Sequence, residues 1–172
     1  EAKIIVVDID RVEHSKNNAR IDRLIIADIK KFLISLIHGQ LTEANIKWRT
    51  KCLHWKNIFL KCEEGYKKSE KVDLYYLAEC LSETIPNEAS LLTDSGLIEL
   101  ILPSNMTFRN GQRSIHPASQ GSMGFALPGL IGAYFASGKP VIAVIGDGSI
   151  MMNLQELETI RYQSIPAKIF LI

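Results

Sequence analysis

Asp147 stands between two glycines in the segment Gly146-Asp147-Gly148-Ser149, directly after the apolar run 141–145. The run predicts a buried strand, and a helical pattern begins just after the turn. Glycines let backbone N–H groups approach an anion closely, a serine hydroxyl can donate a hydrogen bond, and Mg²⁺ prefers carboxylate oxygens. The segment therefore predicts a turn that binds a phosphate and its metal ion. The alternative is a plain strand-to-helix connection.

A second polar glycine turn follows another predicted strand. Residues 89–93 form a short apolar run, and Asp94, Ser95 and Gly96 come immediately after it. In parallel sheets, ligands bind beyond the carboxyl ends of the strands. Because both turns follow such strand ends, we expect them to face one ligand.

The elements that must position these turns alternate in type along residues 70–172. Asp73 can cap a helix that Pro86 stops. The remaining expected elements are helices over 125–136 and 154–163, a strand over 167–172 and an irregular stretch over 106–119. This order predicts an α/β fold, a parallel sheet with helices on both faces.

The first part of the chain has a different pattern. Two apolar strands are expected over 3–9 and 21–26, followed by a helix that Asp28 caps and Gly39 ends. These strands lack enough chain to cover both of their faces, so we expect partner strands upstream of residue 1. Because Glu1 is not an initiator methionine, we interpret the sequence as a fragment.

Residues 41–68 show a helical pattern, and the polar stretch 65–70 then breaks it. An apolar stripe recurs at helical spacing and predicts a packing face; it consists of Trp48, Cys52, Trp55 and Phe59. Three segments follow: 1–38, a connecting helix and linker over 39–69, and 70–172.

The composition excludes several functional classes. The chain has 172 residues with 20 basic and 19 acidic side chains, so we expect no nucleic-acid partner. Its three cysteines have no CxxC spacing, which indicates neither a disulfide framework nor a zinc site and favours a reducing compartment. No apolar run reaches the ~20 residues that cross a bilayer. We therefore expect a cytoplasmic protein without a membrane partner.

Three runs in order closely resemble the diphosphate-binding domain of thiamine diphosphate enzymes, especially the acetolactate synthase group. They are GSMGFALPG from Gly121, the GDGS turn at Gly146 and MNLQEL from Met152. The resemblance implies that 70–172 is a thiamine diphosphate-binding domain truncated at its C-terminus. It also implies that 1–38 is the C-terminal part of that family's central Rossmann-like domain, and that an Asn-Asn pair would follow Ile172.

The resemblance also implies roles for individual residues. Asp147 resembles the family's Mg²⁺ ligand, and Met123 resembles the apolar residue that props the cofactor in its bent form, although Met123 could instead be a core residue. The glutamate that activates the cofactor is expected outside this fragment, from a neighbouring subunit, and His116 is interpreted as a loop histidine. The residues implied to bind the cofactor are Ser95, Gly96, Leu97, Gly121, Ser122, Met123, Gly146, Gly148 and Ser149.

The implied activity of the whole enzyme is decarboxylation of a pyruvate-like 2-oxo acid and transfer of the resulting carbanion to a second carbonyl. The cofactors would be thiamine diphosphate and Mg²⁺; FAD is possible but not supported by the residues present, and a homodimer or homotetramer is expected. Residues 117–120 depart from the acetolactate synthase pattern. A simple decarboxylase, of the phosphonopyruvate type, and a non-catalytic remnant that acts in subunit association are the alternatives.

Overall fold

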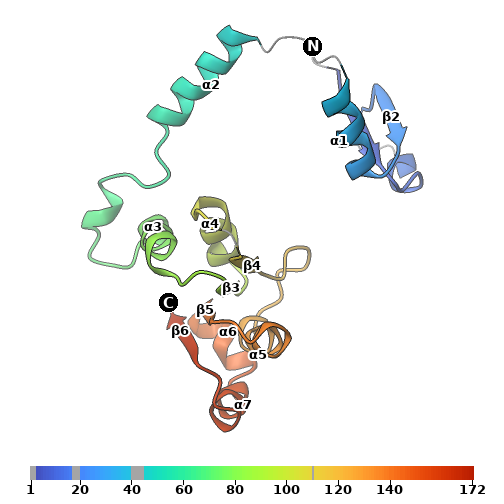
Figure 1. Cartoon of the computed structure of the whole chain (residues 1–172). Helices are drawn as coiled ribbons and strands as arrows, with labels where there is room; N and C mark the ends of the chain where they lie inside the picture. Colours follow the sequence, from blue (N-terminus) through green and yellow to red (C-terminus); the bar gives the residue numbers. More distant parts are fainter. Residues whose placement is uncertain (1–2, 17–19, 40–44, 110) are drawn as a thin grey trace. The chain divides into compact units, whose positions relative to one another are not determined.

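A computed structural model describes residues 3–16, 20–39, 45–109 and 111–172. It divides the chain into two compact units, Glu1–Asn57 and Ile58–Ile172. Figure 1 shows both units, coloured along the sequence, and labels most of their helices and strands. The three-segment division expected from the sequence stays a prediction, but residues 58–69 fall within the second unit and not in a separate linker.

In the first unit, β1 (Ile5–Asp8) and β2 (Arg23–Ile26) pair in parallel, with Ile5 opposite Arg23. A short 3-10 helix, η1 (Glu13–Lys16), lies between them in the sequence. The helix α1 (Ile29–His38) begins after Asp28, whose side chain accepts a hydrogen bond from the backbone N–H of Lys31 at 3.0 Å. The cap predicted at Asp28 is therefore present.

The continuous helix expected over 41–68 is wrong in extent. Residues 41–44 lie outside the described residues, α2 spans Ile46–Ile58, and η2 (Tyr66–Lys68) is a separate 3-10 turn. The chain leaves the helical path because Cys62 is buried and the ammonium of Lys61 donates to the carbonyl of Met106 at 3.4 Å. The stripe expected to pack is solvent-exposed: Trp48, Cys52 and Trp55 are exposed on α2, and Phe59, which follows the last residue of that helix, is 73% exposed.

The second unit is built on a four-stranded parallel sheet in the order β4-β3-β5-β6. The strands are β3 (Ser90–Thr93), β4 (Arg113–Ile115), β5 (Val141–Ile145) and β6 (Ala167–Leu171). The helices are α3 (Leu74–Thr84), α4 (Leu97–Asn105), α5 (Ala126–Ser137), α6 (Asp147–Met152) and α7 (Glu156–Tyr162). The expected α/β class is confirmed.

Alternate residues of β5 face two separate apolar cores, as the period of two in a strand requires. Ile142 and Val144 pack with α3 and α4, including Leu81 and Leu102. The other face of β5 packs with α5 and α7; its core includes Val141, Ala143, Ile145, Leu127, Leu130 and Ile160. Both faces of the sheet are therefore covered, which is why β5 has no polar residue.

Two elements were missing from the sequence-based expectation. The strand β4 lies in the stretch 106–119 that was expected to be irregular, and α4 had no predicted counterpart. The strand has only three residues, two of them polar, so its sequence carries no clear alternation. The helix contains Pro103 and has a glycine at its N-cap, both of which obscure a helical pattern.

Candidate functional site

The sheet has a switch point between β3 and β5. The chain passes from β3 through α4 to β4 on one side, then crosses back through α5 to β5 on the other side. Thr93 and Val144 are in register, and the backbone N–H of Asp94 donates to the carbonyl of Val144 at 3.2 Å. The turns that follow β3 and β5 are therefore neighbours, at the place where ligands bind in such sheets.

The side chain of Asp94 fixes the backbone at the carboxyl end of β3 through buried hydrogen bonds. Its carboxylate is fully buried and accepts hydrogen bonds from three backbone N–H groups: Ser95 at 3.0 Å, Gly124 at 2.9 Å and Ala126 at 2.8 Å. These bonds tie the start of α5, and the glycine turn before it, to the end of β3. The sequence marked Asp94 only as part of a polar turn. Its position immediately after a predicted strand and before Ser95 and Gly96 was the sequence feature that could have indicated this supporting role.

The turn after β3 leaves a helix end open. Gly96 has φ +91° and is the N-cap of α4, with no side chain capping the helix. A side chain at such a φ is strained, so glycine suits this position. Leu97, the first residue of α4, is 66% exposed. Backbone N–H groups at the start of a nine-residue helix that lacks a side-chain cap can donate to an anion.

The GSMG run forms a tight turn that is held from two sides. Gly121 and Gly124 have φ values of +57° and +83°. Asp94 holds the N–H of Gly124, and the side-chain amide of Asn153 donates to the carbonyl of Gly124 at 2.8 Å. A Cβ on Gly124 would lie only 2.7 Å from the Cβ of Met152. The turn thus leaves Ser122 and Met123 exposed, with Met123 at 50%.

The turn after β5 places Asp147 in solvent as the first residue of α6. Its backbone N–H donates to the carbonyl of Ile172 at 3.2 Å, and its Oδ1 accepts from the N–H of Gly148 at 2.7 Å. Ser149, in contrast, is only 5% exposed. The carboxylate is therefore the accessible group of this turn, and the hydroxyl expected to meet a phosphate lies mostly inside it.

Gly148 and Met123 bring the two motif turns together. A Cβ on Gly148 would lie 3.4 Å from the Cε of Met123, so the missing side chain leaves room for the methionine. The structure thus groups, at one edge of the sheet, all the residues implied to bind the cofactor. Their assigned roles stay predictions.

One acid–imidazole pair near this edge was not expected. Glu99, on the first turn of α4, is 9% exposed, and its Oε1 lies 3.4 Å from Nδ1 of His116. The other carboxylate oxygen would lie 3.7 Å from a Cβ on Gly121. His116 is therefore more than a free loop residue, since it is paired beside the GSMG turn.

Two features are absent from the part of the chain that the structure describes. No group of three or more His, Cys, Asp or Glu side chains there is arranged to hold a metal ion. Likewise, none of the helices within the described ranges has the length and apolar character needed to span a membrane.

Residues 94–172 match the family model described as "Thiamine pyrophosphate enzyme, C-terminal TPP binding domain". The matched segment begins at Asp94. It includes the turn after β3, the GSMG turn and the turn after β5, which we call the three motif turns.

Acetolactate synthases match almost the whole chain. Acetolactate synthase 1, chloroplastic, of Zea mays is 33% identical over 179 residues, covering 99% of this chain and 27% of the relative. The acetolactate synthase large subunit of Cyanidium caldarium is 34% identical, covering 99% of this chain and 30% of the relative. The large subunit of Buchnera aphidicola is 33% identical over 95% of this chain and 29% of its own length. The chain thus spans less than a third of these relatives.

Proposed function

We propose that residues 94–172, which match the model of the C-terminal TPP binding domain of thiamine pyrophosphate enzymes, form such a domain and that the chain is part of an acetolactate synthase-like carboligase. The proposed enzyme decarboxylates a pyruvate-like 2-oxo acid and joins the two-carbon unit to a second carbonyl. The observation that carries the proposal is the meeting of the three motif turns at the switch point of the sheet.

The residues present fit the diphosphate of the cofactor. The start of α4 has no side-chain cap, and Gly96 has open space where a side chain would stand. Across the switch point, Gly146 and Gly148 leave the backbone of the second turn accessible. We therefore assign the diphosphate to the space between these turns, with backbone N–H groups as its donors.

Asp147 is the proposed Mg²⁺ ligand. Its carboxylate is exposed at the same edge, and Mg²⁺ at a phosphate site needs only one or two carboxylates besides the phosphate oxygens. The lack of a larger acidic cluster among the described residues is therefore compatible with this assignment.

Bound thiamine diphosphate would supply a nucleophilic carbon for addition to the 2-oxo acid and an electron sink for the loss of CO₂. The residues of this chain would hold the cofactor in position. Met123, in van der Waals range of a Cβ on Gly148, would support the cofactor between its two ends. Asp94 and Asn153 fix the backbone of the turn that carries Met123. The activating glutamate would come from a neighbouring subunit. We propose that the whole enzyme is a homodimer or homotetramer and that it is located in the cytoplasm.

A simple 2-oxo acid decarboxylase is the second candidate, favoured by the Glu99–His116 pair. Decarboxylation without carboligation ends with protonation of the new carbanion, and an imidazole held by a buried carboxylate is a suitable proton donor. The pair lies beside the Gly121 turn, next to the proposed cofactor position.

The test is to incubate the full-length protein with pyruvate, thiamine diphosphate and Mg²⁺ and to identify the products. Acetolactate would support the carboligase, and free aldehyde alone would support the decarboxylase. The absence of CO₂ release with pyruvate and with substituted pyruvates would contradict both.

The metal assignment needs its own variants. We expect Asp147→Ala to abolish Mg²⁺-dependent activity and tight cofactor binding. The matched control is Glu158→Ala, which removes a carboxylate that pairs with Arg161 on the surface of α7. Equal Mg²⁺ dependence in wild type and Asp147→Ala would refute the role of Asp147.

A further inference from the structure

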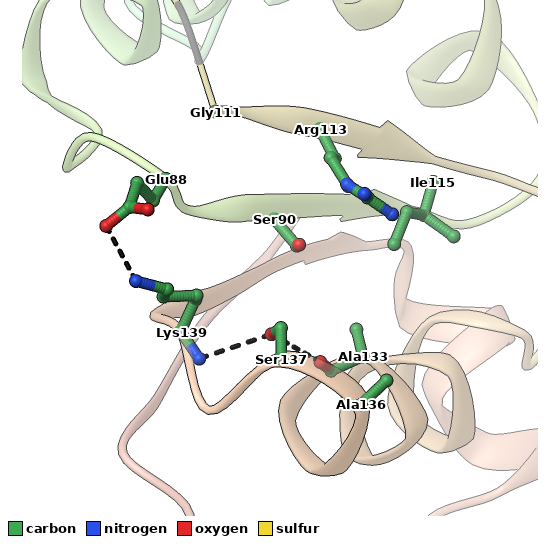
Figure 2. A pocket seen from close by; sticks show the side chains of 9 residues that line it. All are labelled: Glu88, Ser90, Gly111, Arg113, Ile115, Ala133, Ala136, Ser137 and Lys139. Carbon is green, nitrogen blue, oxygen red and sulfur yellow. Dashed lines mark hydrogen bonds and ion pairs between the residues drawn. The ribbon is translucent and has the colours of Figure 1, made fainter.

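A hollow of about 390 Å³ lies at the edge of the sheet opposite to the proposed cofactor position. Figure 2 shows it between the amino ends of β3 and β4 and the last turn of α5. Its lining residues are Glu88, Ser90, Gly111, Arg113, Ile115, Ala133, Ala136, Ser137 and Lys139. None of them belongs to the three motif turns, so the proposed function does not use this hollow.

The register of the strands explains why polar groups point into the hollow. Ser90 of β3 is opposite Arg113 of β4, and Leu92 is opposite Ile115, so these four share the face that α5 covers. The helix ends at Ser137, and Gly138 turns the chain away with φ +64°. The apolar residues farther along the strands therefore lie under α5, whereas Ser90 and Arg113 lie at the open end.

Arg113 has a charge that nothing in the described part of the chain neutralises. No hydrogen bond or ion pair joins its side chain to another described residue, and in Figure 2 the guanidinium extends from β4 into the hollow, alongside Ile115. A guanidinium offers several N–H donors in a planar fork that matches a carboxylate or phosphate. Arg113 is therefore suited to an anion that enters this space.

Ser90 supplies a second polar group at this hollow. The residue is 3% exposed, and its hydroxyl has no hydrogen-bond partner among the described residues, yet Figure 2 shows it directed into the hollow. Among the described residues, the buried side-chain oxygens without a partner are those of Thr93 and Ser114 and not that of Ser90, so the Ser90 hydroxyl is open to the hollow and can bond to a ligand oxygen or a water molecule.

The charged side chains at the rim of the hollow, Lys139 and Glu88, are paired with each other. Lys139 therefore does not compete with Arg113 for an anion. Lys139 Nζ lies 2.8 Å from Glu88 Oε2, so these two charges offset each other. At the end of α5, the carbonyl of Ala133 accepts from the Ser137 hydroxyl at 2.7 Å and that of Tyr134 accepts from the N–H of Gly138 at 2.7 Å. The charged side chains of the lining thus leave one net positive charge, that of Arg113.

We propose that this hollow is a second binding site, for a small organic anion whose carboxylate or phosphate group meets Arg113 and Ser90. The methyl groups of Ala133 and Ala136 and the side chain of Ile115 would contact a short apolar part of the ligand. This site does not depend on the proposed function, because it uses the opposite edge of the sheet.

The experiment is to titrate the purified protein separately with butyrate and with inorganic phosphate at constant ionic strength. Binding is followed by calorimetry and by the amide NMR signals of Ser90, Gly111 and Ala136. We expect saturable binding of at least one probe, with shifts at these three amides and none at Gly146 or Asp147. The stronger probe distinguishes a carboxylate site from a phosphate site.

Three variants make the result specific. Arg113→Gln should weaken binding about tenfold or more, Arg113→Lys should restore part of the affinity, and Ser90→Ala should cause a smaller loss. Arg109→Gln is the matched control, because it removes an exposed arginine of the neighbouring loop that does not line the hollow. Circular dichroism verifies that each variant is folded. No saturable binding, or equal losses in Arg113→Gln and Arg109→Gln, would overturn the proposal.

Discussion

The carboxylate of Asp94, at the end of β3, accepts a hydrogen bond from the backbone N–H of Gly124, thirty residues later, at 2.9 Å. This bond crosses the switch point of the sheet and joins the first polar turn to the GSMG turn. Together with the bond from Ala126 at 2.8 Å, it sets where α5 begins. The geometry of the proposed cofactor position therefore depends on a side chain that is itself fully buried.

Asp94→Ala should destabilise the protein strongly. The change leaves the N–H groups of Gly124 and Ala126, both buried, without their acceptor. We expect a loss of about 2–4 kcal/mol in the free energy of unfolding, since each orphaned group costs about 1–3 kcal/mol. Urea denaturation followed by circular dichroism measures it. Asp147→Ala is the control, because Asp147 is exposed and should change stability by less than about 0.5 kcal/mol. Similar losses in the two variants would contradict the role of Asp94.

Gly124→Ala should also be destabilising. A Cβ there would lie 2.7 Å from the Cβ of Met152 and 2.8 Å from Nδ2 of Asn153, and φ is +83°. We expect a cost of about 1–3 kcal/mol in thermal or urea denaturation. Gly132→Ala on α5 is the matched change, because a Cβ there meets nothing within 4 Å. That variant should be neutral or more stable by up to about 1 kcal/mol, since alanine favours a helix. A stable Gly124→Ala protein would show that the turn is less tightly packed.

The ion pair at η2 should make stability depend on pH. Lys67 Nζ lies 3.0 Å from Glu79 Oε1, and this hydrogen bond lowers the pKa of Glu79 below its usual value of 4.5. A lowered pKa in the folded state stabilises the protein above the unfolded pKa, and this contribution disappears as the pH falls through the folded value. We therefore expect wild type to exceed Glu79→Gln in stability at pH 7 and the difference to shrink below about pH 4.5.

The control for this pH dependence is Glu83→Gln, at an exposed position on the same helix. Denaturation of the three proteins at pH 7, 5 and 3 provides the comparison. A constant difference between wild type and Glu79→Gln across this range would show that the effect is not electrostatic.

The cysteines should differ in reactivity. Cys62 is 8% exposed, and burial raises the pKa of its thiol, with the hydrogen bond to Glu79 acting in the same direction. Only the thiolate reacts with alkylating agents, so Cys62 should be modified at least about tenfold more slowly than exposed Cys52 at pH 8. Peptide mass mapping after timed treatment with iodoacetamide measures both rates, and urea should abolish the difference. Faster modification of Cys62 would mean that residues 58–69 are not packed as described.

The sequence alone determined the elements whose signals are local. The apolar run of β5 ends at a glycine–aspartate turn, Asp28 and Asp73 cap the helices that follow them, and Gly138 ends α5 in a left-handed conformation. Each depends on neighbours within a few residues, so pattern and turn chemistry were sufficient. The three motif runs likewise indicated the resemblance to thiamine diphosphate enzymes, because their residue types and order are visible without a fold.

Only the tertiary structure decided which distant residues support those runs. Asp94 accepts a hydrogen bond from an N–H group thirty residues away, and Glu99 contacts His116, seventeen residues away. The strand β4 has only three residues of weak strand propensity and forms because it pairs with the edge of β3. The hollow at Arg113 likewise results from the register of β3 and β4 and from the point at which α5 ends. Such contacts come from the closing of long loops around a shared sheet, and no local pattern records which residues will then meet.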